Sequence, residues 1–380
     1  MGARRLRSLI SDPFVLTLIL GAALRIILML LVAPITDGYY FTTESASHLL
    51  SLVNPYNHTF TDIPANLLTK GSEQAFAYLP LVAVYSSAFQ LLLGDIRYGL
   101  TVADIIIAIS IHHINQNNRG QSPRRATLLS AAYLLSPLTV LWTSWTGVNT
   151  CIGVALLMLS LTFLYENREK WAGATFGLSL AALQLSWILV PTLFVHSLHR
   201  DRNGGRGRAR RFILYTIVAC ASVMLPFLVS SPRDLINDVL VFHLARDPTP
   251  LFKMVAFPNA EINISLNALL NTLHLATLPL FAKILILAPA LVLVLRRSNT
   301  LENTIRGSLV FSTIFLFVLP NNLLINYLLL PIPLLLIVLL PSVTAQRKPE
   351  PAHVETTGVI AEAAEATDII PGPRSLGSEK

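Results

Sequence analysis

The stretch FVLTLILGAALRIILMLLV, residues 14–32, is followed at once by APITDGYYFTTESASHLL, residues 33–50. The first stretch carries one charge, Arg25, and as a helix rising about 1.5 Å per residue it nearly matches a hydrocarbon core of about 30 Å. A secretory signal would have a shorter apolar core of about 7–15 residues, so we expect a retained membrane anchor. The second stretch places Asp37 and Glu44 where that span ends.

The composition of the whole chain agrees with a membrane location. Of 380 residues, 53% are hydrophobic and 13% are charged, whereas soluble domains have about 25% charged residues. We therefore expect an integral membrane protein, in the plasma membrane or, in a eukaryote, the endoplasmic reticulum. The net charge of +7 is concentrated in loops, where it sets topology, so no nucleic-acid partner is expected.

Further apolar runs predict a polytopic, all-α fold. Spans inside lipid must satisfy their own backbone polar groups, and solid apolar blocks favour helices over a barrel. With the first run they predict roughly eight to eleven transmembrane helices over a domain at residues 1–341, while residues 342–380 are predicted to be a disordered cytoplasmic tail. The additional runs are 103–114, 128–145, 151–165, 171–198, 212–230, 278–295, 309–319 and 323–340.

Basic segments set the expected orientation. By the positive-inside rule we expect them in the cytoplasm, which puts Asp37 on the other face. They are Arg4, Arg5 and Arg7 before the first span, the arginines of 200–211, Arg296 with Arg297, and Arg347 with Lys348.

One basic loop, NQNNRGQSPRRA at 115–126, fits this scheme only with two adjustments. We predict that FAYLPLVAVYSSAFQLLLG, residues 76–94, lies along the outer surface, and that the run 171–198 turns back at Pro191. The turn 145–149 would then lie beside Asp37. The alternative is that the rule fails at this one loop.

The outer face then collects two long loops. FTTESASHLLSLV, residues 41–53, spaces its apolar residues as an interfacial helix does. SPRDLINDVLVFHLARDPTPLFK, residues 231–253, interleaves apolar residues with acids, a histidine and cations. Together these loops suit a lipid-linked anionic substrate.

The ordered motifs of the chain resemble those of a known superfamily. ITDGYYFT, NPYN, FAYLPL, AAYLLSPLTVLWTSWTGVNT, LINDVLVFHLARDP and NYLLLPIPLLLIVL occur in this order within residues 13–341. This succession resembles the GT-C polytopic glycosyltransferases, and most closely the PIG-M-type mannosyltransferases and related polyprenyl-phosphate-dependent enzymes. The resemblance implies inverting transfer of a sugar, mannose in this group, from a polyprenyl-phosphate donor to a glycolipid or glycan acceptor on the non-cytoplasmic face.

The resemblance also implies an essential acid in the first outer loop, the position of Asp37. PIG-M-type enzymes have Asp-x-Asp there, whereas this chain reads ITDGYY, so the sequence assigns no metal site and leaves a divalent metal cofactor without support. As a general base, Asp37 would accept the proton of the attacking hydroxyl. The alternative is an ordinary interfacial acid that helps to end the span. Glu44, seven residues on, is expected to hold the acceptor or tune Asp37, unless it is a solvated helix residue.

Three further residues complete the predicted site. His243 and Arg246 suit the donor phosphate. The alternative for Arg246 is an ion pair with a neighbouring aspartate on a solvated surface. Asn149 either orients sugar hydroxyls or only caps a short outer turn. Two other classes stay open: a non-catalytic scaffold subunit of the PIG-U type that acts with partner subunits, and a lipid or small-solute transporter, for which Asp104 in TVADIIIA is the chief candidate.

Overall fold

The computed structural model describes residues 12–64, 67, 75–117, 122–202, 207–242, 252–256, 259–262, 265–320 and 325–339. These belong to the unit Met1–Pro341, and the predicted disordered tail lies outside them. The helices and strands are α2 (Pro13–Leu31), α3 (Asp37–Leu50), η1 (Pro55–Asn57), α4 (Pro80–Leu93), α5 (Arg97–Asn117), α6 (Pro123–Leu134), α7 (Pro137–Ser144), α8 (Thr150–Tyr165), α9 (Glu169–Ala182), η3 (Gln184–Leu189), α10 (Val190–Arg202), α11 (Arg208–Ser230), α12 (Pro232–Ile236), η4 (Asn237–Val241), β1 (Phe252–Ala256), β2 (Asn259–Ile262), α14 (Leu266–Thr272), α15 (Leu280–Arg297), α16 (Leu301–Val318), η5 (Ile325–Leu329) and α17 (Pro331–Val338).

The all-α, polytopic class is confirmed. Apart from the antiparallel pair β1–β2, the described elements are helical. Four described helices, α2, α5, α11 and α16, are long and apolar enough to cross a membrane, and the pair α6–α7, bent by 46°, adds a fifth candidate. Three shorter apolar helices, Pro80–Leu93, Thr150–Tyr165 and Tyr327–Val338, accompany these candidates in the described part of the chain. The protein is an integral membrane protein.

Proline and polar caps define where many of these helices begin. Proline occupies the first turn of α2, η1, α4, α6, α7, α12 and α17. Its fixed φ suits that position, and the N–H that it lacks would have no partner inside the helix. Asp12 caps α2 by accepting a 2.8 Å hydrogen bond from the Phe14 amide. The sequence therefore fixes the start of the first span.

The run 171–198 does turn back, as predicted. The chain leaves α9 at Leu183, whose backbone is extended, and returns through η3 into α10. The residues that flank the run on either side are close together, because the Arg200 guanidinium lies 3.5 Å from the Glu169 carboxylate. The predicted hinge at Pro191 is wrong: that proline lies in the first turn of α10, where it is tolerated, and the break comes earlier.

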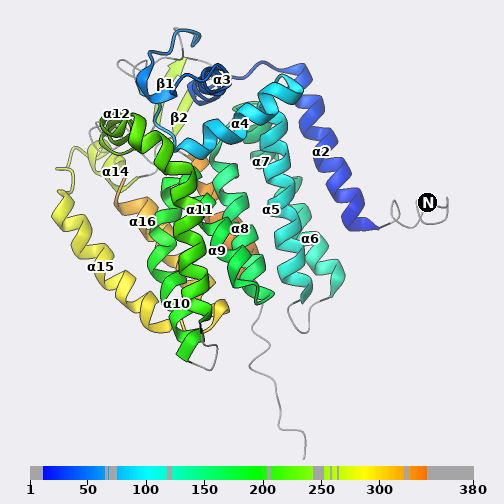
Figure 1. Cartoon of the computed structure of the whole chain (residues 1–380), viewed down its shortest axis with the longest axis vertical. Coiled ribbons are helices and arrows are strands. Elements are labelled where there is room, and N and C mark those ends of the chain that lie inside the picture. Colours follow the sequence, from blue (N-terminus) through cyan, green and yellow to red (C-terminus); the bar gives the residue numbers. More distant parts are fainter. Residues whose placement is uncertain are drawn as a thin grey trace, which may run out of the picture. The chain divides into compact units, whose positions relative to one another are not determined.

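The predicted surface position of residues 76–94 also agrees with the structure. Tyr78, before α4, lies beside Gly38, and Arg97, after α4, donates 3.1 Å to the carbonyl of Val32. Both ends of α4 therefore lie at the end of the bundle where α2 stops. Its 14 residues would cover only about 21 Å in any case. Figure 1 shows α3 and α4 together at this end.

The segments next to the basic loops gather at the opposite end. Phe14 stacks on His112 with ring centroids 3.7 Å apart, and His113 lies 2.8 Å from Glu166. Three more contacts join the remaining segments to the same end: Arg200 to the Leu164 carbonyl, His199 to the Ser298 carbonyl, and Arg125 to the Leu339 carbonyl. The described ends of loop 115–126, residues 115–117 and 122–126, thus lie at the same end as the segments that flank the other basic loops, as predicted.

Among the described residues, two charged side chains inside the bundle are completely buried. Arg25 of α2 and Asp104 of α5 are both fully buried and form an ion pair of 2.9 Å. Tyr133 donates to the other carboxylate oxygen at 2.7 Å, and Thr143 also donates to Asp104. Arg25 donates in addition to the carbonyl of Leu134 at 2.7 Å. Every charge in this network has partners, so burial is compensated.

Candidate functional site

Asp37 is the first residue of α3 and follows the first span after five residues of irregular chain. It is half-buried, and its Oδ1 accepts a 2.7 Å hydrogen bond from the Gly38 amide. A carboxylate at a helix N-terminus is favoured by the partial positive charge of the unpaired amides there. Local structure therefore holds the Asp37 carboxylate at the end of the bundle where α2 stops, called the surface end below.

The turn 145–149 packs against the start of α3. The Ile35 amide donates to the Trp145 carbonyl at 3.3 Å, and the Thr36 hydroxyl donates to the Thr146 carbonyl. Gly147 has φ +66° and is covered by Tyr39, which would lie 2.8 Å from an added Cβ. Glycine is required here both by the backbone conformation and by this close approach.

The structure brings Asn149 and the Asp37 helix together. Asn149 is buried and donates at 3.0 Å to the hydroxyl of Thr42, which in turn donates at 2.7 Å to the carbonyl of Gly38. Asn149 does not cap α8 through its side chain. The expectation that it only caps an outer turn is therefore wrong, and the residue connects α8 to the turn of α3 that carries Asp37.

Arg97 is a site residue that the sequence did not suggest. Its guanidinium donates to the carbonyls of Val32 at 3.1 Å and Ser144 at 2.9 Å, pairs with Asp95 at 2.7 Å, and lies 5.5 Å from the centre of the Tyr39 ring. It thus joins the end of α2, the end of α7 and the first turn of α3. Burial, followed by the charge of Asp95, raises the pKa of Tyr39 above its ordinary value. Tyr39 therefore keeps its proton as a hydrogen-bond donor near Asp37.

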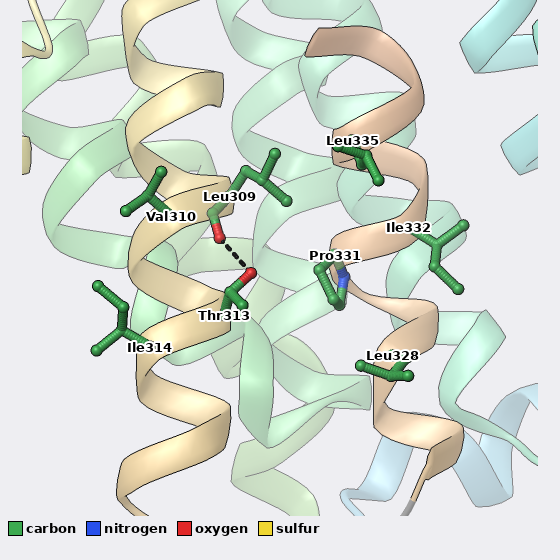
Figure 2. A pocket seen from close by; sticks show the side chains of 8 residues that line it. All are labelled: Leu309, Val310, Thr313, Ile314, Leu328, Pro331, Ile332 and Leu335. Carbon is green, nitrogen blue, oxygen red and sulfur yellow. Dashed lines mark hydrogen bonds between the residues drawn. The ribbon is translucent and has the colours of Figure 1, made fainter. Parts of the chain in front are cut away.

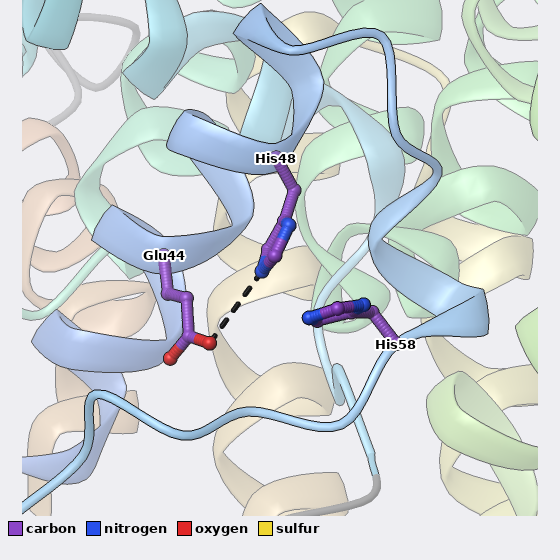
Figure 3. Close-up of side chains that lie close together, drawn as sticks. All are labelled: Glu44, His48 and His58. Carbon is purple, nitrogen blue, oxygen red and sulfur yellow. Dashed lines mark hydrogen bonds and ion pairs between the residues drawn. The ribbon is translucent and has the colours of Figure 1, made fainter.

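Glu44 is buried, which contradicts its interpretation as a solvated residue. Its two carboxylate oxygens accept hydrogen bonds from the amides of Thr61 at 3.0 Å and Asp62 at 3.1 Å. One of them also lies 3.5 Å from Nε2 of His48, one turn along α3. The ring of His58, from the loop after η1, packs 3.9 Å from that of His48. Figure 3 shows the three side chains converging from the helix and the loop.

These three residues could hold a metal ion. One ligand atom from each of Glu44, His48 and His58 lies within 4.8 Å of the other two. The sequence interpretation paired Glu44 with Asp37 and did not consider the histidines. The spacing Glu-x3-His in residues 44–48 was visible, since positions four apart share a helix face. His58 had no such signal.

The two predicted outer loops pack together in the described part of the chain. The carboxylate of Asp238, in η4, accepts a 2.9 Å hydrogen bond from the Phe76 amide, and Asn54 donates to Ser230 and Ser231. Burial raises the pKa of Asp238 to about 6. His243 and Arg246 lie outside the described residues. Residues of both loops contribute to one apolar cluster. It contains Phe41, Tyr56, Phe60, Phe76, Phe227, Leu235 and Val239, among others.

An apolar groove of about 450 Å³ lies elsewhere, between α16 and the η5–α17 segment. Figure 2 shows side chains from both segments lining it, among them Val310, Ile332 and Leu335. Its polar side chain, Thr313, is bonded to the Leu309 carbonyl of its own helix at 2.8 Å. None of the residues that line the groove is a candidate site residue or an acid. The groove therefore suits the binding of a hydrocarbon chain and not a catalytic reaction.

Comparison with known proteins identifies the fold. The structure is similar to two crystal structures of ArnT from Cupriavidus metallidurans, one bound to undecaprenyl phosphate and one in the apo state, each with a TM-score of 0.53 and 15% sequence identity. ArnT is a GT-C glycosyltransferase. The chain has the GT-C fold. The similarity covers 84% of this chain and 58% of ArnT, so the chain spans less than two thirds of that protein.

No protein-family model matches the chain, and no curated protein matches it. The resemblance inferred from the ordered motifs is confirmed at the level of the GT-C fold. These similarities do not show PIG-M-type specificity.

Proposed function

We propose that the protein is an inverting glycosyltransferase that moves a sugar, mannose in our proposal, from a polyprenyl-phosphate donor to a lipid- or protein-linked acceptor. The observation that carries this proposal is the position of Asp37 in a chain with the GT-C fold. It starts α3 directly after the first span, at the end of the bundle away from the basic segments.

In the proposed reaction an acceptor hydroxyl attacks the anomeric carbon of the sugar. The new carbon–oxygen bond forms on the face opposite the leaving group, the bond from the anomeric carbon to the phosphate oxygen breaks, and polyprenyl phosphate leaves with its electron pair. Asp37 accepts the proton of the hydroxyl, a contribution of about 10²–10⁴-fold to the rate. Asn149 acts as a positioning residue, because it holds the first turn of α3 through Thr42.

The donor phosphate requires cations or hydrogen-bond donors. We propose His243 and Arg246, which follow η4 in the chain, for this role, because a guanidinium pairs well with phosphate oxygens. The groove between α16 and α17 is proposed to take part of the prenyl chain, since it is apolar and lies on helices of the membrane domain. With the basic end in the cytoplasm, the reaction takes place on the non-cytoplasmic face.

The transporter alternative loses its main support. It rested on Asp104 as an unpaired charge in a span, and Asp104 is neutralised by Arg25 and bonded to two hydroxyls. Buried acids that serve transport lie in pathways that water or substrate can enter, whereas both members of this pair are fully buried.

The test is a transfer assay with protein reconstituted in lipid nanodiscs. We expect release of free polyprenyl phosphate from polyprenyl-phosphate mannose in the presence of acceptor, and donors with other sugars establish the sugar specificity. Asp37→Asn keeps size and polarity but cannot take up the proton, so turnover should fall at least about 10²-fold. A rate above half that of the wild type would remove Asp37 from the mechanism.

Asp12→Asn is the matched control. It makes the same carboxylate-to-amide change at the other end of α2, where asparagine caps a helix as well as aspartate does. We expect wild-type turnover. If the wild-type protein releases no polyprenyl phosphate from any donor, the non-catalytic scaffold subunit becomes the better interpretation.

A further inference from the structure

The Glu44–His48–His58 cluster has the chemistry of a metal centre. Imidazole nitrogens and one carboxylate oxygen are common ligands of Zn²⁺, and three protein ligands leave a fourth position for water or another group. The nearest ligand atoms of the three side chains lie within 4.8 Å of one another. Small side-chain rotations bring such atoms to about 2.0–2.2 Å from one ion.

The surroundings hold the three side chains in place. Glu44 is fixed by two amide hydrogen bonds from Thr61 and Asp62, the kind of outer interaction that orients ligating carboxylates. The loop that carries His58 is anchored on both sides, because the Tyr56 hydroxyl donates at 2.6 Å to the Tyr78 carbonyl and Phe60 is buried against Phe41. His58 itself is exposed, so an ion can enter from solvent.

We propose that Glu44, His48 and His58 bind one divalent transition-metal ion of the Zn²⁺ class, which fastens the loop after η1 to α3. The fourth coordination position faces the exposed side of the cluster. Asp37 lies two turns before Glu44 on the same helix, about 10 Å along its axis. The ion therefore secures the element that carries Asp37 and does not touch it. The proposal does not depend on glycosyl transfer, since metal binding is measured without a sugar donor.

The experiment uses the full chain purified in nanodiscs through an affinity tag that contains no histidine. After removal of metal with EDTA and titration with Zn²⁺, we expect about one tightly bound ion per chain by calorimetry and elemental analysis. His58→Ala removes an exposed ligand without disturbing the core and should weaken binding at least about tenfold. Zn²⁺ should raise the unfolding temperature of the wild type but not of this variant.

His113→Ala is the matched control, because His113 also lies 2.8 Å from a glutamate but belongs to no group of three metal-ligand side chains among the residues that the structure describes. It should keep wild-type affinity. Co²⁺ in place of Zn²⁺ should give the visible absorption of a four-coordinate site in the wild type and lose it in His58→Ala. The proposal is overturned if the wild type binds less than a tenth of an equivalent, or if His58→Ala binds as tightly as the wild type.

Discussion

Two groups of buried charges in this protein are built in different ways. Inside the bundle, Arg25 and Asp104 neutralise each other, and hydroxyls and carbonyls take up their remaining hydrogen-bonding capacity. At the surface end, Glu44 is also buried, but its partners are two backbone amides and His48, and the exposed His58 packs against His48. No arginine or lysine is paired with Glu44 among the residues that the structure describes.

This difference separates a structural network from a site. A charge pair that satisfies itself within the membrane domain stabilises one packing of α2 against α5 and offers nothing to a ligand. The Glu44 carboxylate is held by two amides at a helix surface, and its oxygens have further acceptor sites that an ion can use. We therefore expect changes in the bundle to affect stability, and changes at the surface end to affect turnover or binding.

The largest expected effect on stability comes from breaking the pair inside the bundle. Arg25→Met leaves Asp104 buried without its cation, and removal of one partner of a buried pair costs about 3–5 kcal/mol. The free energy of unfolding, measured in mixed micelles by titration with a denaturing detergent, should fall by this amount. Turnover per folded molecule should stay the same, because neither residue touches the surface end.

The double variant Arg25→Met/Asp104→Asn is the control for this prediction. It removes both charges and keeps an acceptor for Tyr133 and Thr143, so it should be clearly more stable than Arg25→Met alone. Equal stability of the two variants would mean that the ion pair is not what holds these helices together. A fall in turnover per folded molecule would contradict the expectation that changes inside the bundle affect stability but not the candidate site.

The sequence predicted the membrane class, the return of the run 171–198 and the common end of the basic segments, because apolar length and arginine distribution are properties of the sequence. The pairing of Arg25 with Asp104 was not predictable in the same way. The two residues are 79 positions apart, and their contact depends on how α2 and α5 are rotated against each other. Each therefore looked like an isolated charge in an apolar run.

The candidate site was predictable only in part, for a related reason. Asp37 and its neighbour Asn149 followed from ordered motifs and from the placement of turn 145–149 on the outer face. The surroundings of Glu44 could not be predicted in this way, because a loop that folds back over α3 supplies both its amide partners and the nearby His58. Such contacts depend on loop conformation, which residue type alone does not determine.

A smaller effect is expected at Asn149, which lies at the surface end of the bundle. Asn149→Ala removes the hydrogen bond to Thr42 and should lower the free energy of unfolding by about 1 kcal/mol. Turnover should fall by roughly tenfold, since displacement of a reacting group by 1 Å can cost up to about 10²-fold. The nanodisc transfer assay measures this change.

Asn115→Ala is the matched control for Asn149→Ala. Asn115 is also a buried amide with one donated hydrogen bond, of 2.8 Å to the Ile111 carbonyl, but it lies near the basic end of α5. It should keep its turnover and lose less stability than Asn149→Ala, because its Oδ1 is buried without a hydrogen-bond partner and the substitution removes that unsatisfied acceptor. Equal loss of turnover in both variants would show that Asn149 acts through general stability and not through α3.

The smallest expected effect concerns Asp238 and its dependence on pH. Burial raises the pKa of this carboxyl to about 6 from 3.8, so the folded protein binds more protons than the unfolded chain between these values. The free energy of unfolding should therefore fall as the pH rises through this window and level off above it. Asp238→Asn keeps an acceptor for the Phe76 amide but does not titrate. Its stability relative to the wild type should rise by less than about 1 kcal/mol between pH 4 and 7, once screening by water is allowed for.

Asp234→Asn, at the neighbouring half-buried acid in α12, is the control. It should leave the pH dependence of stability nearly as in the wild type, because it removes only a secondary contribution to the raised pKa of Asp238. A wild-type stability that rises over this range relative to Asp238→Asn would mean that the hydrogen bond from the Phe76 amide outweighs burial in its effect on the pKa of Asp238.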